Sequence, residues 1–339
     1  MSEIVVVINP GSSSTKFGVY SFSEQIFKIQ LPGNPPPVVS LYKMLEPYLA
    51  KSKIVAIVSR GGLLRPLPGG VYLVDDSMLS DLRENKYGKH ASNLGAQIAS
   101  ELALEFGVPA FIVDPVTTDE FESLARISGV PGIERISRGH FLNIKAIARQ
   151  ASRDLDCAYI SARFIVAHLG GGISIAALKY GRIIDINDAL LGMGPFSPQR
   201  AGSLPLRSVL DLAYRHSRSV VEKLLSKSSG LAGYLGTDDM LKIERRIIAG
   251  DQKTKLIVDA MVYQIAKEIG AMTTVLRGRI QGIIITGGLA NSEYIVKELE
   301  ERIRSLGKIL IYPGEMELKA LAQGAWRVLN GEETVLKYD

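Results

Sequence analysis

The chain carries the same local pattern twice, about half its length apart. In the first copy the apolar run VVVI leads through Asn9 and a turn of small residues to a second apolar run, FGVY. In the second copy FIVA leads through His168 and a glycine turn to IAAL. Three pairs of residues share one offset, 159 positions: Asn9 and His168, Gly11 and Gly170, and Thr15 and Ser174. Unrelated glycine turns would also give two hairpins, but the shared order favours two related domains.

Short β-branched runs and helical patterns alternate along the 339 residues. The predicted strands are Ile4–Ile8, Ile54–Val58, Ala110–Val113, Ile165–Ala167, Ile183–Ile186, Gly282–Thr286 and Ile309–Tyr312. The predicted helices are Ala91–Phe106, Asn143–Leu155, Val209–Ser226, Asp259–Leu276, Ser292–Ser305 and Glu317–Asn330. Alternation of this kind indicates an α/β protein with largely covered sheets, and the length suits two domains.

Composition excludes several classes of function. The 40 basic and 35 acidic residues leave a net charge of +5, and the basic residues are scattered, which favours a mildly basic enzyme surface over nucleic-acid binding. A single cysteine, Cys157, excludes an internal disulfide framework and indicates a reducing compartment. The N-terminus does not resemble a signal peptide, and no apolar run approaches the roughly 18 residues of a membrane span. We therefore expect a cytoplasmic protein with no membrane partner.

The two small-residue turns suit phosphate, because several backbone N–H groups can converge on one anion there. Established phosphate loops do not explain them, since GSSSTK lacks the second glycine of a G-x-x-x-x-G-K-[ST] loop and no G-x-G-x-x-G opens a helix. We therefore expect paired hairpins to hold any nucleotide. The candidate phosphate-binding residues are Ser12, Ser14, Lys16, Gly170, Gly171, Gly172 and Ser174.

A third glycine site lies between a predicted buried strand and a predicted helix. Gly287 and Gly288 permit close approach of a flat ligand such as a nucleoside, although a turn with no ligand would look the same. Asn291 or Ser292 caps the helix that follows.

Eight segments, in this order, carry a family resemblance: NPGSSSTK, SRGGLLRPLPGG, YGKHASNLG, FIVDPVTTDE, VAHLGGGIS, GPFSPQRAGSLP, YLGTDDM and ITGGLANSE. The pattern resembles butyrate kinases, in the acetate kinase branch of the superfamily that includes sugar kinases, Hsp70 and actin. The resemblance implies an α/β fold of two similar ribonuclease-H-like domains, each a mixed sheet flanked by helices, with the active-site cleft between them. It implies an N-terminal domain over 1–145, carrying the C-terminal helix 318–331, and a nucleotide-binding domain over 146–317.

The activity implied by the resemblance is phosphorylation of a short-chain carboxylate by ATP. Butyrate and ATP would give butanoyl phosphate and ADP, with Mg²⁺ as cofactor and a homodimer as the assembly. Another short acid such as acetate, propionate or isobutyrate stays open, because an apolar pocket discriminates one methylene by only about 1–3 kcal/mol. An alternative of a different class is a non-catalytic ATP-dependent switch like Hsp70 or actin.

Transfer of a phosphoryl group to a carboxylate brings two anions together, so arginines and a metal are the expected catalysts. The resemblance makes Arg200 the arginine that stabilises the transferring phosphoryl group, and gives Arg60 either that group or the substrate carboxylate. His168 corresponds to a histidine that donates to the phosphoryl group, with Asn9 as its counterpart in the first hairpin. His140 lies in a further similar segment, to which no separate role is given.

The remaining implied roles concern the metal and the nucleoside. Asp114 has a metal-linked role and Glu317 supplies a second carboxylate, with Glu315 as a close rival. The implied nucleotide contacts are Asp239, Gly287, Gly288, Leu289 and Asn291. The chain departs from the family at Leu241, where an arginine is usual, and at Gln199, where a glutamate is usual. We expect the neutral Gln199 to leave Arg200 less compensated.

Overall fold

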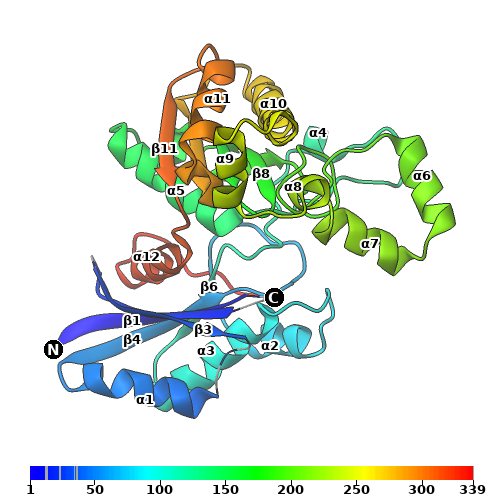
Figure 1. Ribbon diagram of the computed structural model, residues 1–339. Coiled ribbons are helices and arrows are strands. Elements are labelled where there is room, and N and C mark those ends of the chain that lie inside the picture. Colours follow the sequence, from blue (N-terminus) through cyan, green and yellow to red (C-terminus); the bar gives the residue numbers. More distant parts are fainter. Residues whose placement is uncertain (12–13, 23, 34, 36, 339) are drawn as a thin grey trace. The chain divides into compact units, whose positions relative to one another are not determined.

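The computed structural model describes every residue except 12, 13, 23, 34, 36 and 339. These residues form two compact units (Figure 1). Unit 1 comprises residues 1–119, 141–143 and 316–339, and unit 2 comprises 120–140 and 144–315. The sequence analysis placed the first boundary at 145, whereas the structure assigns 120–140 to unit 2.

Unit 1 is built on a sheet of six strands in the order β3-β2-β1-β4-β6-β5. β1 is parallel to β4 and β4 to β6, while the other neighbours are antiparallel. The strands are β1 Ser2–Pro10, β2 Ser14–Tyr20, β3 Gln25–Pro32, β4 Ser52–Arg60, β5 Val71–Leu73 and β6 Ala110–Val113. The helices are α1 Val38–Leu49, α2 Asp76–Arg83, α3 Asn93–Phe106 and α12 Glu317–Leu329.

The central strand β1 is apolar on both faces because helices cover both. Side chains alternate along a strand, and Ile4 and Val6 face the core that contains residues of α1 and α3. Val5 and Val7 point the other way and are equally buried. α12 packs against β1, on the side of the sheet opposite α1 and α3 (Figure 1). This arrangement accounts for the unbroken run IVVVI in the sequence.

Unit 2 has a sheet of five strands in the order β11-β10-β7-β8-β9. The strands are β7 Arg163–Leu169, β8 Ile173–Lys179, β9 Arg182–Ile186, β10 Gly282–Gly287 and β11 Ile309–Pro313. The helices are α4 Ser123–Arg126, α5 Phe141–Asp154 (whose first three residues belong to unit 1), α6 Leu206–Arg215, α7 Arg218–Lys227, α8 Gly230–Leu235, α9 Met240–Ile248, α10 Gln252–Val275 and α11 Glu293–Ile303, with short 3₁₀ turns at Tyr159–Ser161 and Gly288–Asn291. α10 packs against β7 and β8, and Val258 and Ile265 on it join the core of the unit.

The duplication predicted from the sequence is present in the topology. The order β9-β8-β7-β10-β11 repeats β3-β2-β1-β4-β6, with two antiparallel and two parallel pairings in the same places. One detail differs from the constant offset. Asn9 pairs with Lys16, whereas His168 pairs with Ser174, so the second turn is one residue shorter. The structural counterpart of Ser174 is therefore Lys16 and not Thr15.

Two of the predicted helices have different limits in the structure. The helix predicted over Val209–Ser226 is two helices, α6 and α7, because His216 and Ser217 are extended and the second helix begins at Arg218. α10 starts earlier than Asp259, since the side chain of Asp251 accepts a hydrogen bond from the Thr254 amide and caps the helix there. No helix in the described part of the chain is long and apolar enough to cross a lipid bilayer.

Candidate active site

Four residues singled out in the sequence meet in unit 1, around the carboxylate of Glu317. Asn9 Nδ2 donates to Glu317 Oε2 over 2.7 Å, and Arg60 Nη1 donates to Oε1 over 3.2 Å. Lys16 Nζ lies 4.0 Å from Oε2. Asn9 and Arg60 stand at the carboxyl ends of the parallel strands β1 and β4, and Glu317 is the first residue of α12, where the helix dipole favours an acid. The sequence motifs gave no indication that one carboxylate would join these groups.

Glu315 and Glu317 belong to different units, although only one residue separates them. Glu315 is in unit 2, where its Oε1 lies 4.0 Å from His168 Nε2 and its side chain is 38% exposed. Glu317 is in unit 1 and its side chain is only 14% exposed. The two candidates for the metal-linked glutamate therefore have different neighbours, and Glu317 is the one grouped with Asn9 and Arg60.

Asp114 ends β6 in an unusual backbone conformation. Its φ is +40°, in the left-handed region that non-glycine residues seldom adopt. Two hydrogen bonds to Gly70 hold it: the Asp114 amide donates to the Gly70 carbonyl, and the Gly70 amide donates to Asp114 Oδ1, both over 2.9 Å. Strained residues of this kind concentrate at functional sites. The carboxylate is buried and fixed in orientation.

Two carboxylates of unit 1, those of Asp114 and Glu317, are the groups that the sequence analysis linked to a metal. Among the described residues there is no group of three or more His, Cys, Asp or Glu side chains that could hold a metal alone. Mg²⁺ commonly binds through one or two carboxylates and takes its other ligands from phosphates and water. Asp114 and Glu317 fit that mode by their chemistry.

His90 is a neighbour of Arg60 to which the sequence analysis gave no role. Its Nδ1 lies 2.7 Å from Ser92 Oγ. Burial, and to a smaller extent the positive charge of Arg60, lower the pKa of His90. The residue therefore stays neutral near pH 7. The only sequence signal for it was its place in YGKHASNLG.

The glycines after Arg60 are needed for close packing and not for positive φ. Asn93 in α3 accepts a hydrogen bond from the Leu63 amide over 2.8 Å and donates to the Gly88 carbonyl. A Cβ atom at Gly62 would lie 2.5 Å from Asn93 Oδ1. Glycine at this position lets Asn93 tie down the chain directly after Arg60.

In unit 2 the candidate His168 forms a compact group with two other side chains. It is buried at the end of β7, and the ring of His140 stacks on it with centroids 4.0 Å apart and planes inclined by 18°. His140 Nδ1 lies 2.9 Å from Ser174 Oγ. His140 thus joins the site in the structure, although its motif alone gave it no role.

Arg200 is packed on the glycine turn that follows His168. Its guanidinium occupies the space that a Cβ atom would need at Gly172, and its Nη1 donates to the Ala189 carbonyl. Ser197 Oγ donates to the Gly171 carbonyl over 2.6 Å and accepts from the Arg200 amide over 3.2 Å, so the loop and the turn are joined. The structure brings Arg200 to the predicted phosphate turn.

Burial and a neighbouring acid act in opposite directions on Arg200. Burial lowers the pKa of its guanidinium and the charge of Asp188 partly offsets this, while an arginine remains protonated at physiological pH. Gln199 Nε2 donates to Asp238 Oδ2 over 2.6 Å, and within the described part of the chain no hydrogen bond joins its side chain to that of Arg200. The expectation that the neutral Gln199 leaves Arg200 less compensated stays a prediction.

The remaining nucleotide candidates hold local structure. Asp239 caps α9 by accepting from the Lys242 amide over 3.3 Å. Gly287 has a φ of +93°, and a Cβ atom there would overlap the backbone of Leu169. Leu289 is buried in the core. Of the two residues offered as the cap of α11, Ser292 is the one whose side chain caps the helix. In unit 1, Ser14 Oγ accepts a hydrogen bond from Gln30 Nε2. Ser12 lies outside the described residues.

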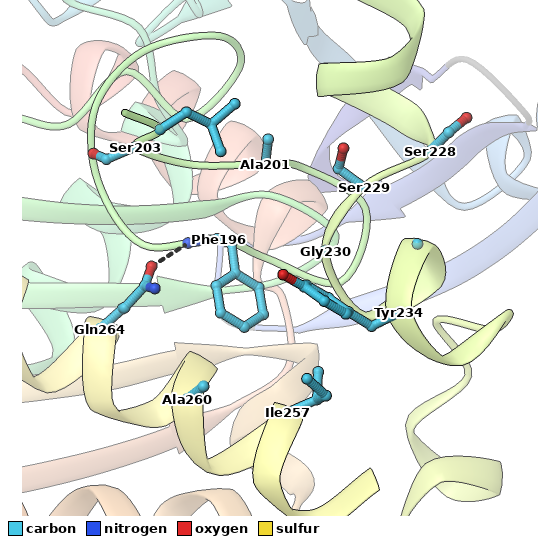
Figure 2. Close-up of a pocket in the computed structure, with 12 residues that line it drawn as sticks. Phe196, Ala201, Ser203, Ser228, Ser229, Gly230, Tyr234, Ile257, Ala260 and Gln264 are labelled. Carbon is cyan, nitrogen blue, oxygen red and sulfur yellow. Dashed lines mark hydrogen bonds between the residues drawn. The ribbon is translucent and has the colours of Figure 1, made fainter. Parts of the chain in front are cut away.

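A separate apolar cavity of about 420 Å³ adjoins the loop that carries Arg200. Figure 2 shows the rings of Phe196 and Tyr234 above Ile257 and Ala260 of α10, and the Phe196 amide donates to Gln264 Oε1 over 3.2 Å. None of the residues that line it was a nucleotide candidate.

We predict that Arg60→Gln raises the pKa of His90. Removing the positive charge makes protonation of His90 easier, but the value stays below the usual 6.5 or so because burial persists. An NMR titration of the four histidines measures it. The control is Arg207→Gln in the exposed helix α6, which should leave His90 unchanged. An equal pKa for His90 in wild type and Arg60→Gln would contradict the electrostatic coupling.

Comparison with known proteins identifies the family. The model of the Acetokinase family matches residues 138–335. A probable butyrate kinase of Enterococcus faecalis (strain ATCC 700802 / V583) is 46% identical over 351 aligned positions, covering 99% of this chain and 98% of the relative.

Solved structures agree on the fold. An acetate kinase of Porphyromonas gingivalis has a TM-score of 0.80 at 19% identity, over 97% of this chain and all of the other. A propionate kinase of Francisella tularensis subsp. tularensis SCHU S4 has a TM-score of 0.73 at 21% identity, over 96% and 99% of the two chains. The predicted fold class of two similar domains, each a mixed sheet with flanking helices, is confirmed. The chain belongs to the acetokinase family.

Proposed function

We propose that this chain catalyses the reversible transfer of a phosphoryl group from ATP to butyrate, giving butanoyl phosphate and ADP. The observation that carries the proposal is the convergence of Asn9, Lys16 and Arg60 on Glu317, which pre-orders a set of anion-binding groups at the strand ends of unit 1. The 46% identity to a probable butyrate kinase supports butyrate as the acid.

The reaction is a direct in-line displacement. A carboxylate oxygen of butyrate forms a bond to the γ-phosphorus, and the bond from that phosphorus to the bridging oxygen of ADP breaks. The carboxylate is already ionised near pH 7, so no general base is needed. The main obstacle is repulsion between two anions, which Arg60, Lys16 and Arg200 reduce. Asn9 and His168 donate hydrogen bonds to the transferring group.

Mg²⁺ is the cofactor we propose, held by Asp114 and Glu317 together with phosphate oxygens. When bound, the ion neutralises charge on the phosphates. The two carboxylates have different hydrogen-bond partners. Asp114 accepts a hydrogen bond from the Gly70 amide, whereas Glu317 accepts from the side chains of Asn9 and Arg60. The single cysteine of the chain supports a cytoplasmic location.

Turnover of a panel of C2–C6 acids with ATP and Mg²⁺ tests the proposed activity. We expect butyrate to have the highest kcat/KM, with acids one methylene shorter or longer lower by roughly 10- to 200-fold. Trapping the acyl phosphate as a hydroxamate measures the product directly. Turnover of none of the acids would contradict a carboxylate kinase, and a preference for acetate would contradict butyrate alone.

We expect Gly172→Ala to reduce kcat by about 10²–10³-fold, similar to Arg200→Ala. The added Cβ atom takes the place of the Arg200 guanidinium, so a donor to the transition state is lost. The matched control is Gly270→Ala in α10 of the same unit, where no atom lies within 4 Å of a new Cβ. Steady-state kinetics of Gly172→Ala, Arg200→Ala and Gly270→Ala measure the three kcat values. A kcat for Gly172→Ala equal to that of Gly270→Ala would contradict the proposed role of the Arg200 guanidinium.

A homodimer is the assembly we propose, with α6 in the contact between copies. Leu206, Leu210 and Tyr214 are 82%, 59% and 89% exposed and recur every four residues, which makes one apolar stripe. α6 and α7 lie to one side of the sheet of unit 2 (Figure 1). Antiparallel pairing of two α6 helices about Leu210 also brings Asp211 of each copy near Arg207 of the other, about 3 Å apart along the axis. Two copies of α6 paired in this way are thus complementary in both their apolar stripes and their charges.

We predict that Leu210→Glu shifts the protein from dimer to monomer. A carboxylate in the middle of the stripe would have to be buried without a partner. Light scattering coupled to size-exclusion chromatography measures the mass. Leu104→Glu is the control, because Leu104 on α3 is 79% exposed and lies in unit 1. A monomeric wild type, or an unchanged dimer in Leu210→Glu, would refute the contact.

A further inference from the structure

Ser174 of β8 lies next to both of the stacked histidines in unit 2. It is the cross-strand partner of His168, and its side chain is fully buried. Its hydroxyl lies 2.9 Å from Nδ1 of His140, the ring that stacks on His168. Ser174 is therefore paired through its backbone strand with His168 and contacts the ring of His140 through its side chain.

The chain before His140 is shaped to allow this contact. A Cβ atom at Gly139 would lie 3.2 Å from Ser174 Oγ and would collide with Ile186. With a hydrogen in place of Cβ, residue 139 can pass over β8 and β9, so the next residue reaches the buried hydroxyl. A larger residue at 139 would move the ring of His140 away from Ser174.

The direction of the hydrogen bond follows from the surroundings of the hydroxyl. A buried hydroxyl needs an acceptor for its proton. Within the part of the chain that the structure describes, His140 Nδ1 is the one group that bonds to Ser174 Oγ. The hydroxyl therefore donates and Nδ1 accepts. In a neutral ring, the proton of His140 then sits on Nε2.

We propose that Ser174 is a positioning residue that holds His140 in the Nε2–H tautomer. His140 then presents an N–H donor, the form that suits an anionic oxygen of a transferring phosphoryl group, beside His168. This role rests on the proposed kinase function. It differs from the expectation that Ser174 donates to the nucleotide, because the hydroxyl is buried and bonded to His140.

The tautomer can be measured without any assay of activity. Near pH 8 an ordinary imidazole is neutral, and ¹⁵N and ¹³C shifts of labelled histidine distinguish its two tautomers. The chain has four histidines, and His140→Gln identifies the signal of His140. We expect Nε2–H in the wild type, a mixture of tautomers in Ser174→Ala, and Nε2–H again in Ser174→Thr. An Nδ1–H form in the wild type, or no change in Ser174→Ala, would overturn the proposal.

A second buried serine of unit 2 provides the matched control. Ser152 in α5 is 2% exposed, and its hydroxyl has no hydrogen-bond partner among the described residues. Ser152→Ala makes the same change of atoms in the unit that carries His140, so it should leave the His140 signal as in the wild type. A shift of that signal in Ser152→Ala as large as in Ser174→Ala would mean that loss of any buried hydroxyl moves the ring, and would overturn the proposal.

Kinetics then test whether the tautomer matters for transfer. We expect Ser174→Ala to lower kcat roughly 10- to 100-fold, the range seen when a hydrogen-bond partner of a ligating histidine is removed. KM for ATP and butyrate should change little, and Ser174→Thr should recover most of the rate. An unchanged kcat in Ser174→Ala would overturn the positioning role. A Ser174-dependent tautomer in a protein that turns over no acid would count against the proposed function alone.

Discussion

The carboxylate of Glu317 is the contact on which the candidate site of unit 1 depends. It binds side chains from β1 and β4, whose sequence positions lie 308 and 257 residues away, and it stands at the start of the last helix. A carboxylate among cationic groups orders them and limits their mutual repulsion before a substrate arrives. An anionic substrate then meets groups that are already in place, so less of its binding free energy is spent on ordering them.

The two hairpins show how one topology can serve two chemistries. In each, the last residue but one of a central strand is polar, Asn9 in β1 and His168 in β7, and an antiparallel strand follows. The longer first turn pairs Asn9 with a lysine, which can bind an anion by charge. The shorter second turn pairs His168 with a buried serine, and the positive charge comes instead from Arg200, packed on the glycines. A difference of one residue in the turn accompanies a different distribution of charge between the units.

Local patterns in the sequence predicted much of the fold, because buried strands and amphipathic helices leave signals of fixed period. The repeated hairpin also predicted the duplication. The break between α6 and α7 was missed although five polar residues, Arg215–Ser219, interrupt the apolar pattern there. In the site, Asn9, Arg60, Asp114, His168 and Arg200 were all named from motifs. The contacts that order them, Glu317 with Arg60, His140 with Ser174 and Arg200 with Gly172, join distant segments, and no local rule predicts such pairs.

The way the chain is divided between the units has a consequence for its synthesis. Unit 1 includes residues 1–119 together with 316–339, so its sheet lacks α12, and its polar cluster lacks Glu317, until residues 316–339 have been made. The apolar face of β1 that α12 covers must stay uncovered while all of unit 2 is being made. The strands of unit 1 are made before those of unit 2, but unit 2 ends at residue 315 and is therefore the first unit to have all of its residues. The nascent chain thus depends on late completion of unit 1, and loss of residues 316–339 would affect residues 1–119 more than residues 144–315.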